Sequence, residues 1–185
     1  MKRILASLLL LVTLTGCGRT DREMDRVLAF RQRILSAEST FQVDITADYG
    51  QEYYQFSMAC KVDKQGGMEF TVTDPETISG ITGTIQQGKG HLTFDDTVLA
   101  FQTMADGLVT PVTGPWLMMK ALRGGYIQSC GPDEENLRIR LCDSYEEDAL
   151  VMDLWLSPED HPVQADIYWK ECRILTLSVK NFATV

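Results

Sequence analysis

Hydrophobic and polar residues alternate with a period of two along much of this chain. Between residues 41 and 49 every odd position is apolar and every even position is polar. This alternation predicts a β-strand with one buried and one solvent-facing side. Two similar runs follow at 54–62 and 68–72, each after a short turn that contains glycine. Short turns between consecutive strands predict an antiparallel meander.

The second half of the chain returns to the same period after a less regular stretch. Acidic runs at 133–135 and 146–148 fall between apolar segments and predict solvated turns. The further candidate strands are 81–86, 91–94, 97–101, 126–129, 136–142, 149–156, 163–169 and 173–182.

Two segments have helical rather than strand periodicity. Residues 21–38 contain no Gly or Pro, and Thr20 with Glu23 fits a capping box at the start. Apolar residues recur there near a period of 3.6, at Met24, Val27, Leu28, Ile34 and Leu35. The second helix, 115–123, begins with proline and is followed by two glycines. The pattern predicts an α+β domain, mostly antiparallel sheet, with one helix before the sheet and another inserted into it.

The inserted helix carries many apolar side chains for its length: Trp116, Leu117, Met118, Met119 and Leu122. One interpretation is a helix that plugs the open side of the sheet. The other is a movable lid, because methionine side chains are flexible enough to adapt to a lipid tail.

The N-terminal residues have the pattern of an export signal. Lys2 and Arg3 precede an apolar run that ends at Gly16. A basic start, an apolar stretch and a small-residue cleavage site define such signals. The run is shorter than the roughly 20 apolar residues of a membrane-spanning helix.

Cys17 closes the sequence Leu-Thr-Gly-Cys, which resembles the lipobox of bacterial lipoproteins. In that family the thiol receives a diacylglyceryl group and the signal is cut just before it. We therefore expect residues 1–16 to be a signal peptide, 17–20 a lipidated tether and 21–185 one domain. The protein is then expected outside the cytoplasm, lipid-anchored to the cell membrane, or to the outer membrane of a cell that has two. An ordinary secretory signal with a chance cysteine is the alternative.

The charge balance narrows the range of partners. The chain has 17 basic and 26 acidic residues, a formal net charge of -9, and loss of Lys2 and Arg3 with the signal would change it to -11. Such a charge argues against binding to nucleic acid. The acidic runs lack the alternating Asp/Asn pattern of a calcium loop, so we expect no metal and no cofactor.

Four cysteines remain beyond the signal: Cys60, Cys130, Cys142 and Cys172. Outside the cell they could form two disulfides in any of three pairings. In the predicted strand order Cys142 and Cys172 lie about 14 Å apart, three strand spacings, whereas a disulfide tolerates Cα separations up to about 7 Å. Free thiols are therefore favoured over bridges, and no Cys-x-x-Cys spacing points to metal chemistry.

The order of elements resembles the superfamily of the lipoprotein carrier LolA and the receptor LolB, with LppX-like and Gram-positive germination-type lipoproteins. The resemblance is carried by residues 156–168 and 175–182, which look like the family's closing hairpin: a strand, a turn that ends in Pro162, and a last strand that ends near Asn181 and Phe182. It implies an unclosed β-barrel whose apolar concave face is covered by helices. It also implies a cavity that buries an acyl chain, at about 0.8 kcal/mol per methylene. The Cys17 anchor departs from the family's soluble shuttle and favours a fixed acceptor or surface binder.

No catalytic motif surrounds the two histidines, His91 and His161, so we expect no enzyme. The leading hypothesis is a membrane-anchored extracytoplasmic lipoprotein that binds a lipid, acyl chain or other hydrophobic ligand in an apolar groove. Its expected walls are Phe41, Val43, Ile45, Phe56, Met58, Phe70, Trp116, Met118 and Met119. The same alternation also serves ordinary core packing. The alternative function is a non-catalytic envelope scaffold or regulatory partner, which presents sheet edges or acidic loops to another surface protein such as a cell-wall hydrolase.

Overall fold

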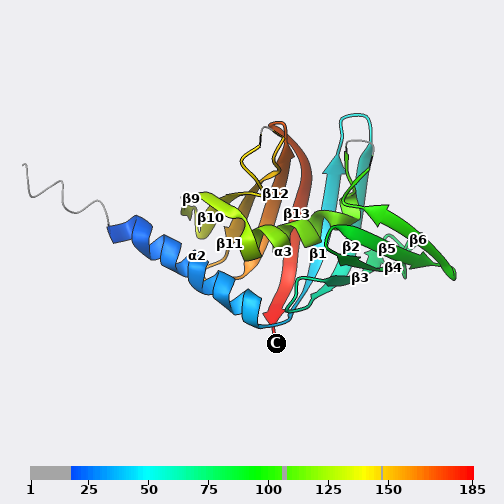
Figure 1. Ribbon diagram of the computed structural model, residues 1–185, viewed down its shortest axis with the longest axis horizontal. Helices are drawn as coiled ribbons and strands as arrows, with labels where there is room; N and C mark the ends of the chain where they lie inside the picture. The colour runs from blue at the N-terminus through cyan, green and yellow to red at the C-terminus, as the bar shows by residue number, and fades with distance from the viewer. Residues whose placement is uncertain (1–17, 106–107, 147) are drawn as a thin grey trace, which may run out of the picture.

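The computed structural model describes residues 18–105, 108–146 and 148–185, and one curved antiparallel sheet dominates it (Figure 1). The helices are α2 (Gly18–Ser36), the 3-10 helix η1 (Pro111–Thr113) and α3 (Gly114–Gly124). The strands of the sheet are β1 (Ser39–Asp48), β2 (Tyr53–Val62), β3 (Met68–Asp74), β4 (Thr82–Gln86), β5 (Lys89–Phe94), β6 (Thr97–Gln102), β9 (Tyr126–Asp133), β10 (Asn136–Cys142), β11 (Val151–Leu156), β12 (Pro162–Trp169) and β13 (Cys172–Thr184). A separate hairpin consists of β7 (Met104–Ala105) and β8 (Leu108–Val109).

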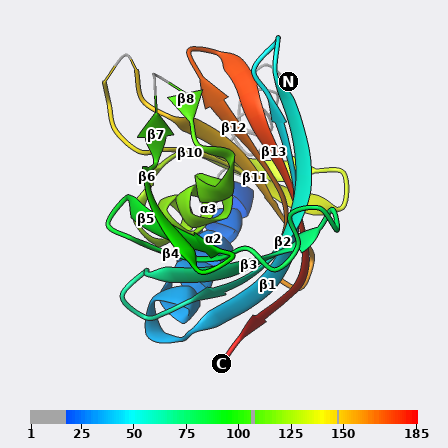
Figure 2. The same cartoon turned by 90° about the vertical axis from the view of Figure 1, so that its right-hand side faces the viewer.

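The first and last strands of the sheet lie side by side at its centre. β1 pairs antiparallel with β13, with Val43 opposite Val179. One wing continues from β1 through β2 to β6, and the other continues from β13 through β12, β11 and β10 to β9. Figure 2 shows the sheet curving around both helices, and β6 and β9 are not paired with each other. The predicted α+β class with an unclosed, curved antiparallel sheet is confirmed.

The alternation in the sequence decides which face of each strand is buried. In β1, Phe41, Val43 and Ile45 are at most 3% exposed, while the polar residues between them are partly or fully exposed. Burial of such side chains contributes about 1.5–3 kcal/mol each. The concave face of the sheet is therefore the apolar face against which the helices pack.

α2 buries one stripe of side chains on this concave face. Val27, Phe30 and Ile34 are at most 2% exposed, because residues three and four apart share a helix face. Leu28 and Leu35, which the sequence analysis assigned to the same face, are 43% and 45% exposed. Each follows a buried residue by one position, about 100° around the helix. That part of the predicted face is wrong.

α2 begins at Gly18, three residues before the predicted start, so residues expected in the tether belong to its first turn. Cys17 and the expected signal peptide, residues 1–16, lie outside the described residues. Within the ranges that the structure describes, no helix combines the length and the apolar character needed to cross a bilayer.

α3 plugs the rest of the concave face. Met118 and Met119 are at most 1% exposed, and Leu122 is 2% exposed. The start of the helix lies against β13, because a Cβ added at Gly114 would be 3.1 Å from Cδ2 of Leu177. The first of the two interpretations of this helix, a plug of the open sheet, is therefore the arrangement observed.

Candidate functional site

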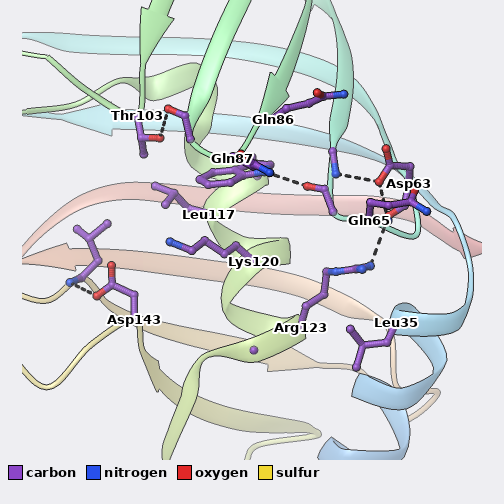
Figure 3. A pocket seen from close by; sticks show the side chains of 16 residues that line it. Leu35, Asp63, Gln65, Gln86, Gln87, Thr103, Leu117, Lys120, Arg123 and Asp143 are labelled. Atoms are coloured by element: carbon purple, nitrogen blue, oxygen red, sulfur yellow. Dashed lines mark hydrogen bonds between the residues drawn. The ribbon is translucent and has the colours of Figure 1, made fainter.

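A cavity of about 980 Å³ opens beside α3 (Figure 3). Its walls come from α3, the C-terminal end of α2, the β2–β3 and β4–β5 turns, and the loop between β10 and β11. The apolar side chains that line it are Leu35, Trp116, Leu117 and Leu150. The polar and charged ones are Asp63, Gln65, Gln86, Gln87, Thr103, Lys120, Arg123 and Asp143. The cavity thus joins an apolar wall, much of it from α3, to hydrogen-bonding groups from the surrounding turns.

A second, smaller cavity of about 160 Å³ adjoins the first on the side of the C-terminal wing. It is lined mainly by apolar residues of α3 and strands β10 to β12, such as Leu141, Met152 and Ile167. Leu117 and Leu150 line both cavities. The smaller cavity therefore extends the larger one towards the core.

Trp116 joins α3 to the turn between β2 and β3. Its indole Nε1 donates a 3.0 Å hydrogen bond to the backbone oxygen of Gly66. Nζ of Lys120 lies 5.5 Å from the centre of the indole ring, a cation–π distance. Within the described part of the chain no carboxylate pairs with this ammonium group. Lys120 therefore brings to the cavity a positive charge that forms no ion pair with a described carboxylate.

The other charged groups at the cavity bind backbone atoms. Arg123 donates to the backbone oxygen of Ile34 at 2.7 Å and to that of Lys64, and Figure 3 shows its side chain reaching the β2–β3 turn. Oδ1 of Asp63 accepts from the backbone N–H of Gly67 at 2.8 Å. Oδ1 of Asp143 likewise accepts a backbone N–H, from the β10–β11 loop. These bonds fix the turns that form the rim.

A second arginine fastens the end of α3 to α2. Arg31 donates from Nε to the oxygen of Leu122 at 2.7 Å and from Nη2 to that of Gly125 at 2.8 Å. These carbonyls lie at the C-terminal end of α3, where a positive charge is favourable. Burial lowers the pKa of the Arg31 guanidinium, which nevertheless stays charged at neutral pH.

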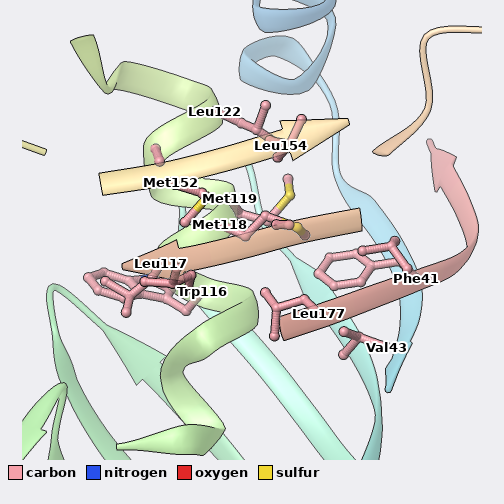
Figure 4. Packing of buried hydrophobic residues seen from close by; sticks show 14 of the residues in the cluster. Phe41, Val43, Trp116, Leu117, Met118, Met119, Leu122, Met152, Leu154 and Leu177 are labelled. Atoms are coloured by element: carbon pink, nitrogen blue, oxygen red, sulfur yellow. The ribbon is translucent and has the colours of Figure 1, made fainter. Parts of the chain in front are cut away.

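The nine residues expected as groove walls lie partly in the core and partly at the cavity. Figure 4 shows the packing of five of them: Phe41, Val43, Trp116, Met118 and Met119. Seven of them are at most 3% exposed: Phe41, Val43, Ile45, Met58, Phe70, Met118 and Met119. Phe56 is partly buried against the same cluster. Trp116 alone among the nine lines the cavity beside α3. The two methionines of α3 pack in the cluster that holds Leu154 of β11 and Leu177 of β13.

Sequence analysis missed most of the residues that line the cavity, because they lie in turns. Gly66 has φ 89° in the β2–β3 turn, and Gly88 has φ 79° in the β4–β5 turn. Alternate turns of a meander lie at the same end of the sheet, so these glycines were a usable signal that the two turns are neighbours. Nothing in the local pattern indicated that Lys120 and Arg123 of α3 would lie beside them.

Two of the four described thiols are made less acidic by burial, Cys60 and Cys130. All four described cysteines are free. Burial raises the pKa of the Cys60 thiol, and burial followed by the charge of Glu23 raises the pKa of Cys130. Cys142 and Cys172 lie on β10 and β13, three strands apart as predicted. In the described ranges no three His, Cys, Asp or Glu residues are grouped so that they could hold a metal ion.

Comparison with known proteins yields similar folds but no sequence match. No family model and no curated protein matches the sequence. Similar solved structures include an uncharacterized conserved protein from Thermus thermophilus, 12% identical, with a TM-score of 0.48 over 88% of this chain and 87% of that one. They include a LolA superfamily protein from Nitrosomonas europaea, 8% identical, TM-score 0.44, covering 90% and 93%. They also include the lipoprotein LppX from Mycobacterium tuberculosis, 11% identical, TM-score 0.42, covering 87% and 93%.

The solved structures of similar fold thus include a LolA superfamily protein and LppX, the groups that the sequence resembles.

Proposed function

We propose that this protein binds a lipid, acyl chain or other hydrophobic ligand in the cavity beside α3. The observation that carries the proposal is the cavity itself, about 980 Å³ with an apolar wall of Trp116, Leu117, Leu35 and Leu150. Ligand sites in proteins commonly have volumes of about 300–1,000 Å³ and combine apolar walls with a few polar groups.

The two kinds of lining suit an amphipathic molecule. Each methylene that leaves water for the apolar wall contributes about 0.8 kcal/mol. A polar head group would then lie against the side chains at the rim, such as Gln65, Gln87 and Lys120. The ammonium of Lys120 favours a head group that accepts hydrogen bonds.

The proposal includes a lipid anchor at Cys17 and a location outside the cytoplasm, as the lipobox pattern predicts. An acyl chain on Cys17 would start beside Gly18, at the opposite end of α2 from Leu35. The helix has 19 residues and is therefore about 28 Å long. This separation supports a cavity that takes a ligand other than the protein's own acyl chains. Radiolabelled palmitate should enter the wild-type protein and not Cys17→Ser.

Titration with a fluorescent fatty acid tests the cavity. Wild-type protein should bind it saturably. Leu150→Trp should weaken binding about tenfold or more, equivalent to at least about 1.4 kcal/mol, because Leu150 lines both cavities and the larger ring would obstruct the passage between them. Leu28→Trp is the matched control, since Leu28 is 43% exposed on α2 and does not line the cavities. No saturable binding, or equal binding by both variants, would count against the proposal.

Native mass spectrometry of gently purified protein gives a second test. A retained mass that matches a lipid or other hydrophobic compound, and that Leu150→Trp loses, would support the proposal. Protein that carries no adduct and does not take up added fatty acid would contradict it.

A further inference from the structure

The open sheet has two edge strands, β6 and β9, and their chemistry differs. An edge strand presents backbone N–H and C=O groups that can pair with a further strand. Natural proteins therefore protect such edges with proline, charge, irregular pairing or a covering element.

β9 carries such protection. A two-residue turn joins Asp133 to Asn136, so these two residues form a hydrogen-bonded pair between β9 and β10. Hydrogen-bonded and non-hydrogen-bonded pairs alternate along an antiparallel ladder. Pro132, which precedes Asp133, therefore has its backbone nitrogen on the outer side of β9. Proline has no N–H to offer there. α2 also packs against this strand. β9 is therefore a poor acceptor of an added strand.

β6 lacks these features. Its six residues, Thr97–Gln102, include no proline, glycine or charged residue. Val98 is 63% exposed and Leu99 is 55% exposed, although both are apolar. An exposed apolar edge of this kind is the arrangement that natural sheets usually avoid.

The turn before β6 fixes which of its backbone groups face outward. Asp95 and Asp96 form a two-residue turn with φ of 48° and 60°, so Phe94 and Thr97 are a hydrogen-bonded pair. Such pairs alternate along an antiparallel ladder. The N–H and C=O groups of the residues at positions 98 and 100 therefore point away from β5. Among the described residues, no other backbone group bonds to them.

β6 belongs to the β5–β6 hairpin, and this hairpin packs against the core through Phe101. A Cβ added at Gly90 would be 2.1 Å from the ring of Phe101, and one added at Gly83 would be 2.4 Å from the ring of Phe70. The two rings, 6.5 Å apart between centroids, also contact each other. Each glycine thus lets an aromatic ring lie flat on the neighbouring strand, and an added strand would meet an ordered edge.

We propose that β6 is a strand-addition site for an extended peptide segment of another protein. Only an extended strand matches the spacing of the outward N–H and C=O groups of Val98 and Ala100. The segment has apolar residues at alternate positions, which would continue the row formed by Leu99 and Phe101. It also has a basic residue close to the turn at Asp95 and Asp96.

Charge favours a basic partner over a second copy of this chain. Asp95 and Asp96 are exposed beside the edge, and the chain has a formal net charge of -9. Two copies would repel each other, whereas a basic segment would be attracted. Residues 94–102 do not line the cavity beside α3, so this inference does not depend on ligand binding there.

A fluorescein-labelled peptide, Lys-Thr-Val-Thr-Val-Thr-Lys, tests the edge by anisotropy with the purified protein. Wild type should bind saturably. Ala100→Pro removes an outward N–H without breaking a bond to β5, so it should weaken binding about tenfold. Ala100→Thr keeps the N–H and should bind within about twofold of wild type.

Val98→Lys gives a second variant that tests the same edge. It adds a positive charge beside the basic peptide and should also weaken binding. His91→Lys is its matched control, because it adds the same charge to an exposed position of β5, one strand from the edge. On peptide binding, the amide protons of Val98 and Ala100 should become protected from hydrogen exchange in NMR spectra.

Several outcomes would overturn the proposal. These are no binding by wild type, equal binding by Ala100→Pro, no new amide protection, or equal binding of a peptide in which both lysines are replaced by glutamate. Self-association of the protein alone that Ala100→Pro abolishes would identify a second copy as the partner, and this also overturns it. Loss of fatty-acid binding by Leu150→Trp with intact peptide binding would separate the two sites.

Discussion

Replacing Met118 by alanine distinguishes a packed core from an open groove beneath α3. Met118 is 0% exposed and belongs to the same buried cluster as Met119 and Leu122. The substitution removes three heavy atoms from a site that excludes solvent. Changes of this kind cost about 2–5 kcal/mol, because the transfer free energy is lost and a cavity remains. At about 2–4 °C per kcal/mol for a domain of this size, the melting temperature should fall by about 4–20 °C.

Urea unfolding followed by circular dichroism measures this loss. Met118→Ala should lower the midpoint without changing the slope of the transition. Met24→Ala is the control, since Met24 of α2 is only partly buried and its truncation should cost less than about 1 kcal/mol. Equal, small losses for both variants would refute the reasoning, because they would mean that the space beneath α3 is already open.

Three further predictions concern charges and a thiol. Arg173→Ala should lower the free energy of unfolding, measured by urea denaturation, by about 1–2 kcal/mol. The buried carboxylate of Asp166 would lose its ion-pair partner, which lies at 3.2 Å. The loss of stability stays small because Arg173 is exposed to solvent, which screens the pair. Lys180→Met should reduce the acid sensitivity of the fold, because hydrogen bonds, chiefly that from Lys180, lower the pKa of Asp44. The stability that this carboxylate contributes is present above its unfolded pKa of about 3.9 and is lost as the pH falls through the lower folded pKa. Urea midpoints measured from about pH 2 to pH 6 test this. An equal loss of stability with acid in wild type and Lys180→Met would contradict it. Iodoacetamide at about pH 8 should leave Cys60 unmodified in the folded protein, since burial raises the pKa of its thiol. It should alkylate Cys172, the exposed cysteine at the start of β13. Mass spectrometry that finds both cysteines modified at the same rate would contradict this.

Strands were predictable because alternation is a local property of the sequence. β10 matches its predicted range, Asn136–Cys142, since three apolar residues alternate there with polar ones. β9 instead continues to Asp133, four residues beyond the predicted end, through Gly131 and Pro132. An edge strand tolerates both of these residues, because its outer backbone groups need no partner. β7 and β8 have two residues each, too few to produce a period.

The cavity depends on contacts that no local pattern contains. The periodicity of α2 identified an apolar helix but could not resolve which side Leu35 faces, and that residue lines the cavity rather than the core. Gln87 and Lys120 meet at the cavity from segments more than thirty positions apart. Their proximity follows from the packing of α3 against β13, which brings one side of this helix beside the turns of the N-terminal wing.

α3 has two faces with different roles, so a substitution on one face can change stability without changing ligand affinity. Trp116, Leu117 and Lys120 face the cavity, while Met118 and Met119 face the core. A ligand that binds only the folded protein stabilises it by about 2.7 kcal/mol at a hundred times its Kd. Met118→Ala acts on the core face, so it should lower the melting temperature yet leave the fatty-acid affinity nearly unchanged. A large loss of affinity in this variant would mean that the ligand instead lies beneath α3, among the residues expected from the sequence to form the groove.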